Sequence, residues 1–122
     1  MESTKIAVIG AGPAGIAVGV EGIRAGISGT ILLEKADHPC DTIASLYRVG
    51  KRVDSIYRKV DVAPRGALSF TTETRESFLD WMDKVVADYG LDVRYGHEVL
   101  QVKREEGRFL IQCGNGVTIA AS

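Results

Sequence analysis

Three glycines and one acidic residue near the N-terminus have the spacing of a nucleotide-binding turn. The glycines are Gly10, Gly12 and Gly15, and Glu34 follows about twenty residues later. Gly10 lets the chain leave a strand, Gly12 leaves room for a pyrophosphate, and Gly15 lets a helix approach the sheet. The carboxylate of Glu34 can accept both ribose hydroxyls and would repel a 2′-phosphate. This pattern predicts a site for an adenine dinucleotide that is not of the NADP type.

The elements around the motif are those of a βαβ unit. The apolar run Ile6–Ile9 precedes the glycines, and a predicted strand from Thr30 to Glu34 ends on the acid. Between them, a helix is expected from about Pro13 to Ala25, and its free N-terminal amides would hold phosphate oxygens. A lone GxGxxG can also be a turn that only packs a helix on a sheet. That alternative leaves the position of Glu34 unexplained.

The middle of the chain combines an irregular stretch with one strong helix. We expect a short helix from Thr42 to Tyr47 and then a basic excursion from Arg48 to Arg65, interpreted as solvated rather than as a phosphate contact. Apolar residues then recur at helical spacing and predict a helix from Glu73 to Tyr89. Thr72 or Thr74 would cap its start, Gly90 would end it, and a third parallel strand would follow at residues 91–95.

The last part of the chain predicts a different kind of sheet. Three short runs, at residues 99–103, 108–113 and 117–120, are separated by glycine-containing turns. Consecutive short strands with tight turns favour an antiparallel β-meander, here over about residues 97–121. The fold class expected is therefore α/β: a single domain, residues 1–122, with a parallel βαβ core and a three-stranded antiparallel meander.

Composition narrows the function classes. A net charge of −1 over 122 residues gives no electrostatic argument for nucleic acid or an anionic membrane, and no apolar stretch is long enough to span a bilayer. Cys40 and Cys113 match no metal or CxxC spacing, which favours reduced thiols in a cytoplasmic protein, and no signal peptide is expected at the N-terminus. His38 and His97 have no partner that the sequence can place nearby. We therefore predict no catalytic residue and no metal site.

The chain resembles the FAD-binding domain of the flavoproteins that carry two dinucleotide-binding domains. More narrowly, it resembles the thioredoxin-reductase-like, pyridine nucleotide-disulfide oxidoreductase-like group, including bacillithiol-disulfide-reductase-like proteins. The residues that carry the resemblance are Ile6–Ala17, Leu32–Lys35 and Gly90–Val93 with Glu98 and Val99. The resemblance implies a Rossmann-like FAD/NAD(P)-binding fold and FAD as the cofactor.

The resemblance also implies roles for individual residues. Glu34 would hold the adenosine ribose, Lys35 would lie beside the adenine, and Val99 would touch the adenine through its backbone. The FAD pyrophosphate would be cradled by six consecutive residues: Gly10, Ala11, Gly12, Pro13, Ala14 and Gly15.

Departures from the family shape the expected function. This sequence holds no second GxGxxG for NAD(P)H, no nicotinamide-binding domain and no paired cysteine motif. It is expected to be the truncated N-terminal, ADP-binding portion of an oxidoreductase that passes hydride from NAD(P)H through FAD to an unknown acceptor, and to be inactive alone. The alternative is a stand-alone dinucleotide-binding module without catalysis, which could form a homodimer to cover its open sheet edge. A one-domain NAD-dependent enzyme would need a catalytic acid or base that the sequence does not offer.

Overall fold

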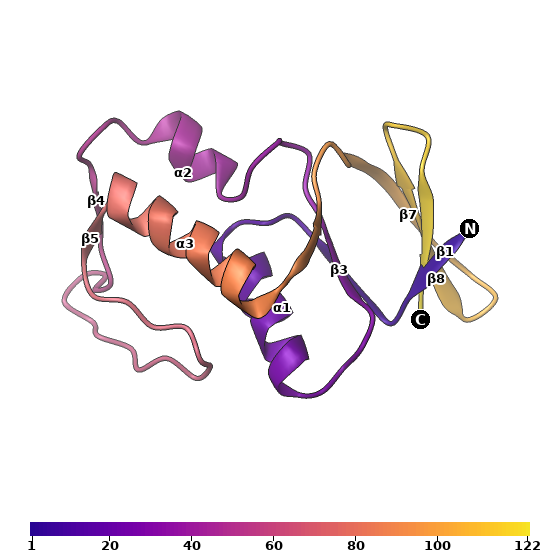
Figure 1. Cartoon of the computed structure of the whole chain (residues 1–122), viewed down its shortest axis with the longest axis horizontal. Coiled ribbons are helices and arrows are strands. Elements are labelled where there is room, and N and C mark those ends of the chain that lie inside the picture. The colour runs from indigo at the N-terminus through magenta and orange to yellow at the C-terminus, as the bar shows by residue number, and fades with distance from the viewer.

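A three-layer arrangement places two helices on one face of a parallel sheet and a second sheet on the other face. The computed structural model describes all residues from 1 to 122, and Figure 1 shows its arrangement. The elements, in chain order, are β1 (Glu2–Thr4), β2 (Ile6–Ile9), α1 (Pro13–Arg24), β3 (Thr30–Leu33), α2 (Asp41–Leu46), β4 (Arg52–Val53), β5 (Glu73–Thr74), α3 (Arg75–Tyr89), β6 (Asp92–Arg94), β7 (Val99–Glu105), β8 (Arg108–Cys113) and β9 (Thr118–Ala121).

The parallel sheet has the strand order β2-β3-β6, as expected for consecutive βαβ units. Its central strand is apolar at nearly every position because both of its faces are buried. Leu32 points into a core shared with α1 and α3. Ile31 and Leu33 point the other way, into a core shared with the second sheet. The parallel sheet therefore lies between two separate hydrophobic cores, and Ala11 of the glycine turn belongs to the first of them.

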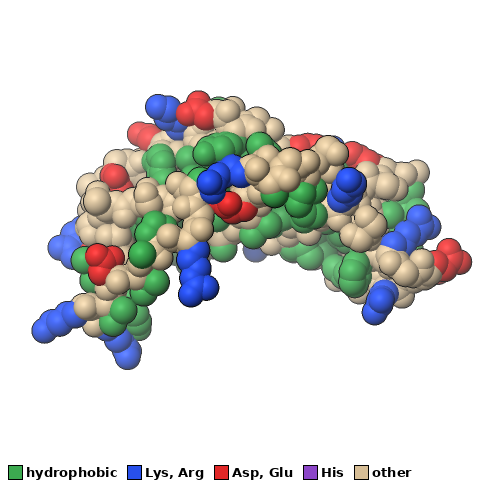
Figure 2. Space-filling model, turned by 90° about the horizontal axis from the view of Figure 1, so that it is seen from below, with side chains coloured by type: hydrophobic (Ala, Val, Ile, Leu, Met, Phe, Trp, Pro, Cys, Tyr) green, Lys and Arg blue, Asp and Glu red, His purple; other side chains and the backbone are tan.

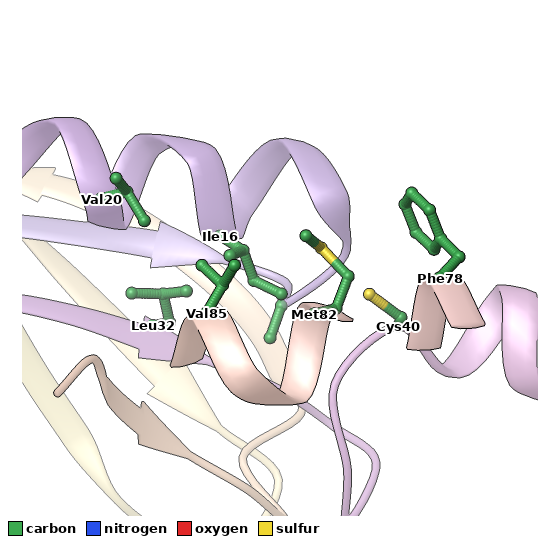
Figure 3. Packing of buried hydrophobic residues seen from close by; sticks show 8 residues of the cluster. Ile16, Val20, Leu32, Cys40, Phe78, Met82 and Val85 are labelled. Atoms are coloured by element: carbon green, nitrogen blue, oxygen red, sulfur yellow. The ribbon is translucent and has the colours of Figure 1, made fainter. Parts of the chain in front are cut away.

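Helix α1 packs closely on this sheet because it carries glycine where the sheet approaches. A Cβ on Gly19 would lie 3.1 Å from Leu32 Cδ1 and 3.3 Å from Leu91 Cδ2. Ile16 and Val20 of α1 are fully buried and pack in one core with Leu32 of β3 and with Met82 and Val85 of α3 (Figure 3). Close approach of this kind fixes the direction in which the N-terminus of α1 points.

Helix α3 is bounded by the residues that the sequence predicts, with one correction. Thr74 is the N-cap and forms a capping box with Ser77, whereas Thr72 has no capping role; Gly90 ends the helix in a left-handed conformation. The helix begins at Arg75 rather than Glu73, because Glu73 and Thr74 pair with β4 as the two-residue strand β5. This long-range pairing leaves no periodic signal in the sequence.

The second sheet is larger than the predicted meander. β7, β8 and β9 pair antiparallel, and β1 adds a fourth strand parallel to β9. The N-terminal residues therefore form a strand of the second sheet before the chain reaches β2, the first strand of the parallel sheet. The chain leaves one sheet and enters the other at Lys5, and the amides of Lys5 and Ile6 both donate to the carbonyl of Gly29.

The basic excursion between α2 and β5 has little regular structure beyond β4 and a bridge between Tyr57 and Val60. Arg58 and Lys59 lie at the tip of that bridge and are exposed. Figure 2 shows Lys and Arg side chains along the left arm of the molecule, where the excursion lies. The exposure of Arg58 and Lys59 agrees with the interpretation of this stretch as a solvated excursion. No helix in the chain combines the length and apolarity needed to cross a membrane.

Candidate dinucleotide-binding site

The glycine turn folds back on itself between the end of β2 and the start of α1. Gly10 has a φ of +96°, a conformation that favours glycine, and its amide donates to the Leu33 carbonyl over 2.8 Å. A Cβ on Gly15 would lie 2.1 Å from the Gly10 carbonyl oxygen. The first and third glycines are thus required by the path of the backbone itself.

The second glycine has a different environment. Gly12 is the N-cap of α1, with a φ of −78° that any residue adopts, and a Cβ there would meet no atom within 4 Å. Pro13 occupies the first helical position, and both Pro13 and Ala14 are exposed. The amides of Gly12, Ala14 and Gly15 have no acceptor within the chain. This end of α1 is therefore an open set of N–H donors at the positive end of a helix dipole.

Glu34 lies immediately beside the glycine turn, although 23 positions separate it from Ala11. Its side chain is buried, with 7% of its surface exposed. Oε1 accepts a hydrogen bond from the Ala11 amide over 3.2 Å, and Oε2 accepts one from the Ala36 amide over 2.8 Å. The structure thus brings the predicted ribose acid and the predicted pyrophosphate cradle to the same edge of the sheet.

A groove of about 320 Å³ continues from the glycine turn along the carboxyl ends of the strands. It is lined by Ile9, Gly10, Leu33, Glu34, Lys35, His97, Glu98 and Val99. Lys35 and Val99, which the resemblance assigned to adenine, therefore share one groove with Glu34. The groove has the position in which open α/β sheets bind ligands, outside the carboxyl ends of the strands.

His97 and Glu98 are groove residues that the sequence did not identify. The only signals in the sequence are that both residues directly precede Val99 and that Glu98 is one of the residues that carry the family resemblance. The amide of His97 donates to the Glu34 carbonyl over 2.9 Å, and its Nδ1 lies 2.8 Å from the Tyr95 carbonyl oxygen. These contacts fix the connection between β6 and β7 against the end of β3.

The largest cavity, of about 570 Å³, lies elsewhere. It is bounded by α1 and residues 64–68 and contains none of the predicted cofactor-binding residues. Glu21 of α1 closes part of its rim, since its carboxylate accepts a hydrogen bond from the Ala67 amide over 2.7 Å. We assign the nucleotide to the smaller groove because that groove contains Glu34 and adjoins the free amides of α1.

The other reactive side chains lie away from the groove. Cys40 is buried behind the glycine turn, where its amide donates to the Ala11 carbonyl, and burial raises the pKa of its thiol to about 11. Burial also raises the pKa of Cys113 in β8. His38 lies between Asp37 and Asp41, and its hydrogen bond to Asp37 raises its pKa. None of these groups has the environment of an activated nucleophile.

A parallel βαβ unit with this turn, and with an acid at the end of its second strand, defines a Rossmann-like dinucleotide-binding domain. The chain belongs to the pyridine nucleotide-disulphide oxidoreductase family, whose sequence model matches residues 7–122. The resemblance and the fold class predicted from the sequence are thereby confirmed. The assignment of single residues to a nucleotide stays a prediction.

Solved structures with the same fold come from disulfide reductases and monooxygenases. A bacillithiol disulfide reductase from Staphylococcus aureus is 24% identical, with a TM-score of 0.79 over 99% of this chain and 36% of that one. A flavin-containing monooxygenase from Stenotrophomonas maltophilia is 20% identical, with a TM-score of 0.79 over 99% of this chain and 37% of that one. A cyclohexanone monooxygenase mutant from Rhodococcus is 25% identical, with a TM-score of 0.74 over 99% of this chain and 25% of that one.

The chain thus spans between 25% and 37% of the length of these structures. At these identities the similarity shows the fold alone. No sequence among the curated proteins matches the chain.

Proposed function

We propose that this chain binds the ADP moiety of FAD, as the N-terminal portion of a pyridine nucleotide-dependent flavin oxidoreductase. The observation that carries the proposal is the 3.2 Å contact between Glu34 Oε1 and the Ala11 amide. It places a ribose-binding acid against a phosphate-binding turn, in a chain that belongs to a family of such oxidoreductases. In the whole protein, hydride would pass from NAD(P)H to FAD and then to an acceptor that we do not name.

The residues of the site fit the cofactor. The free amides of Gly12, Ala14 and Gly15, with the dipole of α1, would hold the pyrophosphate, and the missing Cβ of Gly12 leaves space for its approach. Each oxygen of Glu34 accepts one amide hydrogen bond, so lone pairs remain for the ribose hydroxyls. Lys35 and Val99 would border the adenine.

A bound flavin would supply the redox chemistry, and the residues of this chain would bind and orient it. We assign no catalytic role to either cysteine, because both thiols are buried and have raised pKa values. The cytoplasmic location expected from the sequence stays a prediction.

A titration with FAD, followed by visible absorbance after removal of free ligand, tests the proposal. The wild-type chain should retain the flavin band, and Gly12→Ala should lose it, because the added methyl group occupies the approach to the pyrophosphate. Gly114→Ala is the matched control, since Gly114 lies outside the glycine turn and a Cβ there makes only ordinary contacts, 3.6 Å from Leu100 Cδ1 and 3.9 Å from the Glu98 carbonyl oxygen. A wild-type chain that retains no flavin, or a Gly12→Ala variant that retains as much as wild type, would contradict the proposal.

A further inference from the structure

Glu34 connects four segments of the chain as well as lining the groove. Its backbone amide donates to the Arg94 carbonyl over 3.0 Å, and its carbonyl accepts from the His97 amide over 2.9 Å. Its carboxylate accepts from the amides of Ala11 and Ala36. The residue therefore links the glycine turn, the loop after β3, the end of β6 and the connection to β7.

The glycine turn needs an anchor of this kind. The methyl group of Ala11 is buried in the core, but Ala11 is flanked by Gly10 and Gly12, which have no side chains to restrain the backbone, and glycine has more conformational freedom than any other residue. Instead, the peptide groups of Ala11 are held from two directions. The Ala11 amide donates to Glu34 Oε1, and the Ala11 carbonyl accepts from the Cys40 amide over 2.9 Å.

We propose that Glu34 is a positioning residue that holds the glycine turn in its phosphate-binding shape before any nucleotide arrives. One carboxylate would then serve two parts of the site: it shapes the pyrophosphate cradle and receives the ribose. Only the second role rests on the proposed function. The first role depends on contacts within the chain alone.

The carboxylate is required because two donors converge on it. An ionised carboxylate offers two acceptor oxygens, and the amides of Ala11 and Ala36 use one each. In Glu34→Gln, the amide side chain keeps one acceptor oxygen and places an NH₂ donor against the other backbone amide. One of the two hydrogen bonds must then be lost. A buried N–H left without a partner is costly, so the turn would shift or open locally.

Glu98→Gln is the matched control. Glu98 also lines the groove, but it is exposed and its carboxylate accepts no hydrogen bond from the backbone. Glu98→Gln therefore makes the same change of charge in the groove as Glu34→Gln, with the same side-chain length, but removes no hydrogen bond to the glycine turn.

Amide hydrogen exchange, measured residue by residue by NMR on the nucleotide-free chain, tests the proposal. In wild type, the Ala11 amide should exchange at least about tenfold more slowly than the Gly12 amide, which has no acceptor. In Glu34→Gln, exchange at Ala11 or Ala36 should accelerate about tenfold or more, while the amide of the core residue Ile119 is unchanged. Glu98→Gln should match wild type at both positions.

Equal exchange of Ala11 and Gly12 in the wild-type chain would overturn the proposal, and this result needs no variant to fold. Exchange at Ala11 and Ala36 that is the same in Glu34→Gln as in wild type would also overturn it. Addition of ADP separates the two proposals. A chain that shows the expected protection but binds no ADP supports the positioning role of Glu34 and contradicts the proposed function.

Discussion

The Cα of Gly15 packs directly against the carbonyl oxygen of Gly10, so closely that a Cβ on Gly15 would lie 2.1 Å from that oxygen. A Cβ on Gly12, by contrast, would meet no atom within 4 Å. The spacing of the motif therefore serves two purposes that the sequence alone does not separate. Gly15 is needed for the chain to fold, and Gly12 is left free for a ligand.

Alanine should consequently destabilise the chain at Gly15 and leave its stability nearly unchanged at Gly12. Gly15→Ala forces a methyl group into backbone atoms that cannot move independently, and should lower the free energy of unfolding by about 1–3 kcal/mol. Gly12→Ala should stay within about 0.5 kcal/mol of wild type. Chemical denaturation of the three proteins measures both values. If Gly15→Ala proved as stable as wild type, the close contact with Gly10 would be wrong.

The N-terminus of α3 gives a second test of local structure. Thr74→Ala removes the side chain that accepts the Ser77 amide hydrogen bond, and should cost about 1 kcal/mol. Thr72→Ala is the control, because Thr72 is exposed, precedes β5 and does not cap the helix. Urea denaturation of the two variants decides between the two caps that the sequence allowed. Equal losses for Thr72→Ala and Thr74→Ala would contradict the observed capping box.

Burial of Cys40 predicts how stability depends on alkaline pH. The thiol has a pKa of 9.0 when unperturbed and of about 11 in the folded chain, because burial disfavours the thiolate. The folded state therefore holds this proton more tightly than the unfolded state. The stabilisation is fully present below pH 9.0 and is lost as the pH rises through about 11, with an upper limit of roughly 2–3 kcal/mol.

The variant that checks this is Cys40→Ala, compared with wild type by thermal unfolding between pH 8 and pH 11. Its stability should fall less steeply with pH than that of wild type, even though its starting value is lower. Tyr95, whose pKa is also raised, chiefly by burial and in smaller part by Cys40, adds a background slope of the same sign that Cys40→Ala should only reduce further. Parallel pH profiles for the two proteins would show that Cys40 is not the group responsible.

The elements with a strong local signal are those that the sequence predicts well. Helix α3 shows its apolar period, and β3 is a short apolar run bounded by turn residues, so both lie within two residues of their expected limits. By contrast, β1 and the β4–β5 pair consist of two or three residues each, and their pairing partners are far away in the sequence. Nothing in such short segments distinguishes them from loops.

The residues of the candidate site also fall into two groups, those that the sequence identifies and those that only the fold brings to the groove. Gly10–Gly15 and Glu34 are defined by spacing within one βαβ unit, so the sequence can identify them. His97 and Glu98 reach the groove because β6 lies next to β3 in the sheet, which is a property of topology rather than of local sequence. The hydrogen bond from the Ala67 amide to the Glu21 carboxylate likewise joins an irregular segment to a helix. Contacts of this type become visible only once the chain is folded.

The central claim is that this chain recognises the ADP moiety of FAD through the glycine turn and Glu34. Its most direct test is isothermal titration of the purified chain with ADP, FAD, FMN and ADP carrying a 2′-phosphate on its ribose. We predict that ADP and FAD bind with comparable affinity, that FMN does not bind, and that the 2′-phosphate weakens binding about tenfold or more, through repulsion by the Glu34 carboxylate. Binding of FMN as tight as that of FAD, or no binding of ADP and FAD, would contradict the claim.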